Sequence, residues 1–182
     1  TQQSHSEAAI NTALEAGINV FDHADIYCKG KSESIFGKLL DHQPSLRDQL
    51  YLQSKVGIRP ATNGLVGRYD FSKEWLLHSI EQSLSRLNTD YLDVYFLHRP
   101  DPLMEPEAVA DVFHHLQNSG KVKHFAVSNM QQHQMAFLQS ALTQPLIANQ
   151  IEMSLHKRDW LEEGVLAGQT EGSNVNFSAG TL

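Results

Sequence analysis

Four side chains that can transfer or stabilise protons follow one another along the chain. They are Asp22, Tyr27, Lys55 and His98. A free tyrosine has a pKa of about 10, too high for an efficient acid at neutral pH. A neighbouring ammonium favours the phenolate, and a carboxylate keeps that ammonium charged and in place. These residue types predict a proton-transfer site with Tyr27 as the acid, while the His98 imidazole hydrogen-bonds the phenol or a carbonyl oxygen.

Further polar residues lie at the ends of two later apolar runs. Ser128 and Asn129 lie at the end of one run, and Gln150 lies near the end of the next. Structural explanations exist for several of these side chains. Asp22, or Ser128 with Asn129, would be a suitable cap for a following helix. Cys28 lies beside Tyr27, but without a partner residue we interpret it as a bystander rather than a nucleophile.

The segments that must position these residues alternate between helix-period stretches and short β-rich runs. Strands are predicted at 18–21, 50–56, 91–97, 124–127 and 146–153. Helices are predicted around 9–14, 34–40, 76–87, 106–119 and 135–142, with Gly17 and Gly120 as stops. Strands that alternate with helices indicate βαβ units and a parallel sheet.

Two parallel architectures compete, a doubly wound sheet and a (β/α)8 TIM barrel. No G-x-G-x-x-G sequence follows any predicted strand, which weakens the dinucleotide-binding version of the doubly wound fold. Polar residues at successive strand ends favour the barrel, because barrel enzymes build their sites there. A complete barrel has eight strands and typically about 250 residues. We therefore expect residues 1–163 to form an incomplete α/β barrel of about five to six βα units, and 164–182 an irregular or disordered tail.

Composition excludes several classes of partner. The 182 residues carry 14 Lys and Arg against 21 Asp and Glu, a formal charge of −7, so a broad nucleic-acid surface or anionic-membrane surface is not expected. No apolar run is long enough to span a bilayer. A single cysteine fits a reducing compartment and predicts a cytoplasmic protein. No His or Cys spacing indicates a metal site, and His114 and His115 are adjacent, so they cannot face one ligand from a helix.

An ordered set of short motifs between about residues 6 and 154 resembles the aldo-keto reductase family. Their order and spacing make the set specific, although a single motif such as SKV means little. The motifs are NVFDHADIY (19–27), SE (32–33), FG (36–37), SKV (54–56), SL (83–84), Leu87, DYLD (90–93) through His98, GKV (120–122), VSN (127–129) and NQIE (149–152).

The resemblance implies a barrel reductase that uses NADPH, less often NADH, to reduce aldehydes and ketones to alcohols. It implies that Tyr27 is the proton donor, that Lys55 and Asp22 tune it, and that His98 orients the carbonyl group. Asp22 would also lie near the cofactor ribose. The positions that would hold the nicotinamide carboxamide are Ser128, Asn129 and Gln150.

Three features depart from the family pattern. Cys28 replaces a common glycine, and His23 stands where threonine is common. The family also binds the cofactor phosphates through loops after the seventh and eighth strands, and nothing in this sequence matches them. Two alternatives therefore stay open: a non-catalytic relative that senses a nicotinamide cofactor, and a lyase with a Schiff base at Lys55. The expected partner is a small carbonyl compound; its identity and the oligomeric state are not predicted.

Overall fold

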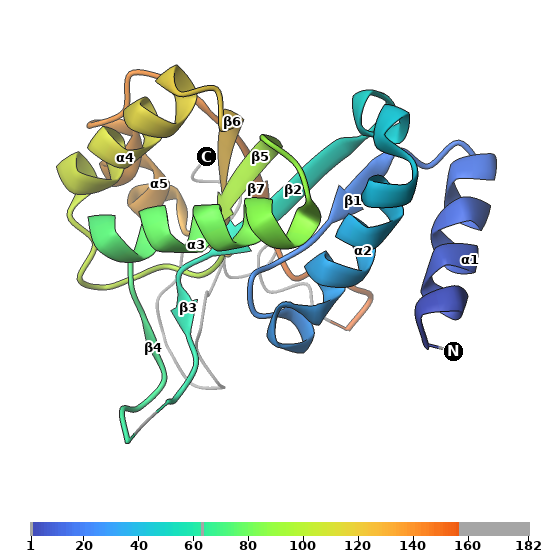
Figure 1. The fold of residues 1–182 in the computed structure, drawn as a ribbon. Helices are drawn as coiled ribbons and strands as arrows, with labels where there is room; N and C mark the ends of the chain where they lie inside the picture. Colours follow the sequence, from blue (N-terminus) through green and yellow to red (C-terminus); the bar gives the residue numbers. More distant parts are fainter. Residues whose placement is uncertain (1, 63, 157–182) are drawn as a thin grey trace.

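A curled parallel sheet of five strands organises the protein (Figure 1). The computed structural model describes residues 2–62 and 64–156. The strand order is β1-β2-β5-β6-β7, and every neighbouring pair is parallel. The strands are β1 (Val20–Asp22), β2 (Tyr51–Val56), β5 (Leu92–Leu97), β6 (Val122–Ser128) and β7 (Leu146–Gln150).

Helices connect the successive strands of the sheet, as parallel pairing requires. The connecting helices are α2 (Lys31–His42), α3 (Lys73–Leu87), α4 (Pro106–Asn118) and α5 (Gln132–Gln139), while α1 (Gln2–Glu15) precedes β1. The 3-10 turns η1 (Tyr27–Gly30) and η2 (Pro44–Gln49) flank α2. Local sequence explains several helix ends. The Ser72 hydroxyl accepts a hydrogen bond from the Trp75 amide at the start of α3, and Pro106 occupies the first turn of α4. The predicted alternation of strand and helix is confirmed.

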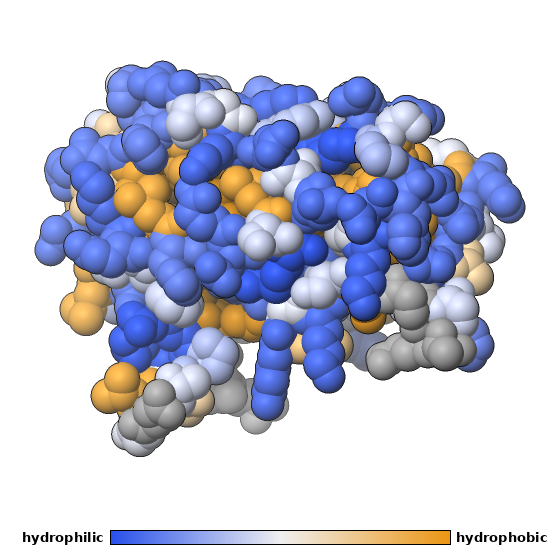
Figure 2. All heavy atoms as spheres, in the orientation of Figure 1, coloured by the Kyte–Doolittle hydropathy of each residue, from blue (hydrophilic) through white to orange (hydrophobic). Residues whose placement is uncertain are grey.

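Alternate residues of each strand face the helices and form the core. Phe21 of β1 packs on Phe36 of α2, with ring centroids 4.9 Å apart, and Phe125 of β6 stacks on Phe113 of α4 at 3.9 Å. Hydrophilic side chains dominate the outer surface of the helix layer, and apolar atoms show between them (Figure 2). The residues between the helix-facing positions, including Asp22 and Lys55, therefore lie on the inner face of the curled sheet.

An antiparallel hairpin of β3 (Ile58–Arg59) and β4 (Arg68–Tyr69) follows β2 and projects beyond the sheet (Figure 1). No sequence pattern predicts this hairpin, because two-residue strands are too short to show a period. Gly57 permits the turn into the hairpin. Its φ is +109°, and a Cβ there would lie 2.2 Å from the Phe71 ring.

Two predicted strand boundaries were wrong. Ile18 donates its amide hydrogen to the Ala13 carbonyl and so closes the end of α1 instead of starting a strand. At the other edge, β7 ends at Gln150, and the amide of Glu152 bonds to the Asn129 side chain rather than to a strand. The predicted tail at 164–182 and the domain boundary before it lie outside the described residues.

Candidate active site

The side chain of Lys55 is the centre of the predicted proton-transfer site. Its Nζ donates to Asp22 Oδ2 at 2.5 Å, to the His23 carbonyl oxygen at 3.0 Å and to the Tyr27 hydroxyl at 3.4 Å. Lys55 is only 2% exposed, whereas the Asp22 side chain is 38% exposed. Burying an ammonium is costly unless it is paired and hydrogen-bonded, and these three oxygens satisfy all its donors.

The parallel pairing of β1 with β2 explains how Asp22 reaches Lys55. Asp22 pairs with Gln53, which lies two residues before Lys55 and so on the same face of β2. Gln53 Nε2 donates to Asp22 Oδ1 at 2.9 Å and fixes the carboxylate from the side opposite the ammonium. Gln53 was not among the predicted site residues, although its period-2 spacing from Lys55 was a usable signal.

Tyr27 reaches the ammonium from the loop that follows β1. A hydrogen bond from the Tyr27 backbone amide to the Ala24 carbonyl turns the loop. The loop continues through Cys28 and Lys29, whose φ angles of 49° and 58° are left-handed. Tyr27 is 38% exposed. Its hydroxyl therefore lies beside a buried positive charge while the ring remains open to a ligand.

His98 is positioned directly after β5, where its amide donates to the Val56 carbonyl at 2.8 Å. Its ring meets the Tyr27 ring edge to face, with centroids 5.8 Å apart and planes at 80°. Burial, and after it the positive charges of Lys55 and Arg99, lower the pKa of His98 to about 4. The imidazole is therefore neutral at physiological pH and can donate one N–H to an oxygen without carrying a charge.

The structure places Ser128, Asn129 and Gln150 in a second group at the ends of β6 and β7. Asn129 adopts a left-handed φ of 54°. Its backbone amide donates to the Gln150 carbonyl, and its side-chain Nδ2 donates to the Ser128 hydroxyl, both at 2.8 Å. None of them caps α5, since Gln131 and Gln134 form that capping box. This excludes helix capping as the reason for Ser128 and Asn129.

The proton-transfer group and the amide-bearing group lie at the same edge of the sheet but form two separate clusters. Lys55 pairs with Phe96, Phe96 pairs with Ala126, and Ser128 follows Ala126 by two residues on the same face. The proton-transfer group lies on β1, β2 and β5, and the amide-bearing group lies on β6 and β7. A flat molecule lying across these strand ends could reach both groups.

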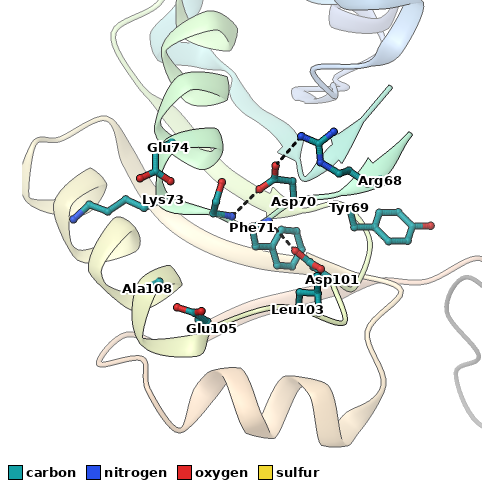
Figure 3. A pocket seen from close by; sticks show the side chains of 11 residues that line it. Arg68, Tyr69, Asp70, Phe71, Lys73, Glu74, Asp101, Leu103, Glu105 and Ala108 are labelled. Carbon is teal, nitrogen blue, oxygen red and sulfur yellow. Dashed lines mark hydrogen bonds and ion pairs between the residues drawn. The ribbon is translucent and has the colours of Figure 1, made fainter. Parts of the chain in front are cut away.

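A pocket of about 460 Å³ lies beside this edge, between the hairpin and the first turns of α3 and α4 (Figure 3). It contains none of the predicted site residues. Its wall is held by Asp101, which accepts from the Phe71 amide at 2.9 Å, and by Asp70, which pairs with Arg59 at 2.7 Å. Asp101 is three residues beyond His98, so its bond to Phe71 holds the loop that follows the imidazole.

Across residues 2–62 and 64–156, no three His, Cys, Asp or Glu side chains are grouped to hold a metal ion. In the same residues no helix is both long and apolar enough to cross a bilayer.

Comparison with known proteins gives a family match over almost the whole chain. The family model described as "Aldo/keto reductase family" matches residues 1–178. The oxidoreductase YcsN of Bacillus subtilis is 44% identical over 163 residues, which cover 86% of this chain and 54% of that protein. A 6-dehydroglucose reductase of Agrobacterium fabrum is 39% identical over 171 residues, which cover 92% of this chain and 58% of that protein. The chain thus spans about half the length of the curated relatives it matches.

Solved structures of aldo-keto reductases share the fold of this chain. A thermostable aldo-keto reductase solved with the inhibitor epalrestat superposes with a TM-score of 0.77 at 25% identity, covering 91% of this chain and 56% of that one. The glycerol dehydrogenase of Gluconobacter oxydans gives a TM-score of 0.74 at 27% identity, covering 84% of this chain and 46% of that one. These likenesses confirm the predicted fold, an incomplete (β/α)8 barrel.

Proposed function

The chain belongs to the aldo/keto reductase family, and from this premise we propose that the protein reduces an aldehyde or ketone to an alcohol with NADPH. Tyr27 is the proton donor in this proposal. The observation that carries it is the buried Lys55 ammonium, which contacts both the Tyr27 hydroxyl and the Asp22 carboxylate. That arrangement places positive charge beside the oxygen that must give up a proton.

Each side chain of the group has a separate task in the reduction. A nicotinamide held at the ends of β6 and β7 would supply the hydride that the carbonyl carbon receives. The Tyr27 O–H bond breaks and its proton goes to the carbonyl oxygen, which has received the electron pair of the carbonyl π bond. Lys55 stabilises the charge left on the phenolic oxygen, and Asp22 keeps the ammonium in place. Neutral His98 donates a hydrogen bond to the carbonyl oxygen and orients it.

The residues at the ends of β6 and β7 fit a carboxamide. A hydroxyl and two side-chain amides, from Ser128, Asn129 and Gln150, offer both donors and acceptors at one edge of the sheet. The Asn129 side chain is already directed by its bonds to Ser128 and to the Glu152 amide. We propose that these three residues hold the nicotinamide amide and that Asp22 lies near the ribose.

The proposal also names the cofactor and the compartment. The family resemblance favours NADPH over NADH, and the exposed, unpaired Cys28 fits a reducing cytoplasm. The substrate in the proposal is a small carbonyl compound.

The geometry argues against a Schiff base at Lys55. A lysine nucleophile needs a free and accessible amine. Lys55 is 2% exposed, and its three N–H donors are directed at Asp22, His23 and Tyr27. Reduction therefore uses the observed arrangement, whereas attack by the amine would have to dismantle it.

The proposed reaction is tested on a protein as long as its relatives, which we call the full-length protein. It is assayed with NADPH and a panel of simple aldehydes. We expect NADPH absorbance to fall only when an aldehyde is present, with one alcohol formed for each NADPH consumed. Tight NADPH binding without turnover would instead support a cofactor sensor. Trapping of a substrate adduct on Lys55 by borohydride would support the lyase.

A further inference from the structure

A second polar cluster lies behind the loop that carries Tyr27. We call it the loop-anchoring cluster; its members are the buried Glu33, Ser54 and Ser79 and the half-buried Asp25 and Arg86. Glu33 of α2 is fully buried and accepts hydrogen bonds from the Ser54 hydroxyl at 2.6 Å and from Arg86 Nε at 2.7 Å. Ser79 and Arg86 belong to α3 and Ser54 to β2, so the cluster ties three elements together. The proposed reaction uses none of these side chains.

One end of the Tyr27 loop is bonded to β2, and the other lies against the cluster. At one end, Asp25 lies two residues before Tyr27, and its amide donates to the Lys55 carbonyl at 3.1 Å. At the other end, Gly30 lies against Arg86, where a Cβ would be 2.9 Å from Arg86 Cδ. Tyr27 lies between these two attachments, so a movement of either end would change the 3.4 Å contact of its hydroxyl with Lys55.

Asp25 is the member of the cluster whose protonation changes near neutral pH. Burial, and then the carboxylate of Glu33, raise the pKa of Asp25 to about 7. A hydrogen bond from Ser79 and the charge of Arg86 act in the opposite direction and are too weak to cancel the rise. Tyr95 of β5 also faces it, fully buried and neutral because burial raises its pKa well above 10.

Ionisation of Asp25 would thus add a second carboxylate near Glu33, and the Arg86 guanidinium is already paired with Glu33. Asp25 Oδ1 is buried without a hydrogen-bond partner in the described residues, so the new charge gains no donor there. A buried charge without full pairing destabilises the conformation that holds it. The segment that can give way is the loop itself, since Glu33 is held on both oxygens.

We propose that Asp25 is a positioning residue for Tyr27: the neutral carboxyl holds the loop so that the phenol contacts Lys55, and the ionised carboxylate releases it. The inference rests on the proposed function only for its consequence in catalysis. The structural step, movement of Tyr27 when Asp25 ionises, stands without any activity.

The structural step is tested with 4-fluorophenylalanine placed at position 27, a probe with no titrating group of its own. The charged or titratable side chains near this ring are Lys55, Asp22 and His98, and the low pKa of His98 keeps it neutral throughout the range of interest. We expect the ¹⁹F shift to follow a transition with a midpoint near pH 7. Asp25→Asn should abolish it, and Glu107→Gln, at an exposed carboxylate of α4, should leave it unchanged.

Two further variants keep the test decisive should Asp25→Asn fail to fold. Ser79→Ala removes a hydrogen bond that favours the charged form and should raise the midpoint by about one pH unit. Glu33→Gln removes the repelling charge and should lower the midpoint by a similar amount. A transition that persists in Asp25→Asn, or midpoints that ignore both Ser79→Ala and Glu33→Gln, would overturn the proposal. So would a flat wild-type titration.

The consequence in catalysis is read from the pH profile of the full-length protein. We expect kcat for aldehyde reduction to decline across the same midpoint and Asp25→Asn to move that decline upward by more than one pH unit, with KM for NADPH unchanged. A protein without reductase activity would refute the proposed function and leave the fluorine titration to decide the role of Asp25. An active Asp25→Asn enzyme with the wild-type profile would refute the positioning role alone.

Discussion

Lys55 Nζ lies 2.5 Å from Asp22 Oδ2 and joins two neighbouring strands across the inner face of the sheet. The buried ammonium is held by a carboxylate that stays partly in contact with solvent. The same ammonium reaches the Tyr27 hydroxyl, so one ion pair places a positive charge where a phenol must lose its proton. The proposed reaction depends on this relationship.

Replacing Lys55 with methionine tests the role of that charge. Lys55→Met keeps the length of the side chain and removes the ammonium beside the Tyr27 hydroxyl. We expect kcat of the full-length reductase to fall by about 10²-fold or more, because the developing phenolate loses its stabilising charge. Steady-state kinetics with NADPH and an aldehyde measure it. The matched control is Lys38→Met at an exposed position of α2, and equal activity in the two variants would contradict the role.

The protonation of His98 gives a pH prediction. Its pKa of about 4 lies below the unfolded value of 6.5, so the folded state favours the neutral ring. The stabilisation is therefore present above pH 6.5 and is lost as the pH falls towards 4. Between pH 7 and 5 we expect His98 to account for a loss of up to about 2 kcal/mol in the free energy of unfolding. Urea unfolding of the wild type and His98→Asn at both pH values checks this, and parallel losses would contradict it.

The ion pair of Arg47 with Asp93 predicts a stability effect far from the site. Arg47 Nη2 and the Leu52 amide both donate to Asp93 Oδ2 at 2.9 Å, and both charged side chains are buried. Asp93→Ala leaves the guanidinium unpaired and should cost about 3–5 kcal/mol in chemical denaturation. Lys123 also contacts Asp93 but is 51% exposed, so Lys123→Ala should cost under about 1 kcal/mol. Similar losses in the free energy of unfolding for the two variants would contradict the role given to burial of the ion pair.

Gly37 predicts a packing effect between α2 and α3. A Cβ at this position would lie 2.1 Å from the Arg86 carbonyl oxygen, which is backbone and cannot rotate away. Gly37→Ala should therefore push the helices apart and cost about 1–3 kcal/mol, despite the better helix propensity of alanine. Thermal or urea unfolding measures the cost. Lys38→Ala, one residue along the same helix and exposed, should be near neutral; a Gly37→Ala protein as stable as wild type would refute the close contact.

The sequence predicted the parts of the fold that repeat. Apolar runs and helix periods locate the five strands and the helices between them, because each element buries a face with its own period. Asp22, Lys55 and His98 were predictable together, since parallel strands end at one edge of a sheet. Boundaries at Ile18 and beyond Gln150 were wrong, because hydrogen bonds to a helix end and to a side chain replace strand pairing there.

The residues that sequence reasoning missed act through contacts between distant segments. Gln53 bonds Asp22 across two strands, and Glu33 meets Arg86 fifty-three positions away. Period-2 spacing puts Gln53 on the same face as Lys55, but its bond to Asp22 also needs the register of β1 against β2. The Glu33 contact depends on how α2 and α3 pack over β2. The hairpin after Gly57 was missed because its strands contain two residues each.

The most direct test of the proposed reaction is the turnover of Tyr27→Phe in the full-length protein, with NADPH and an aldehyde that the wild type reduces. The change removes the proton donor and keeps the ring against His98. We expect kcat to fall by about 10²- to 10⁴-fold while NADPH still binds. Turnover equal to that of the wild type would contradict the assignment of Tyr27 as the acid.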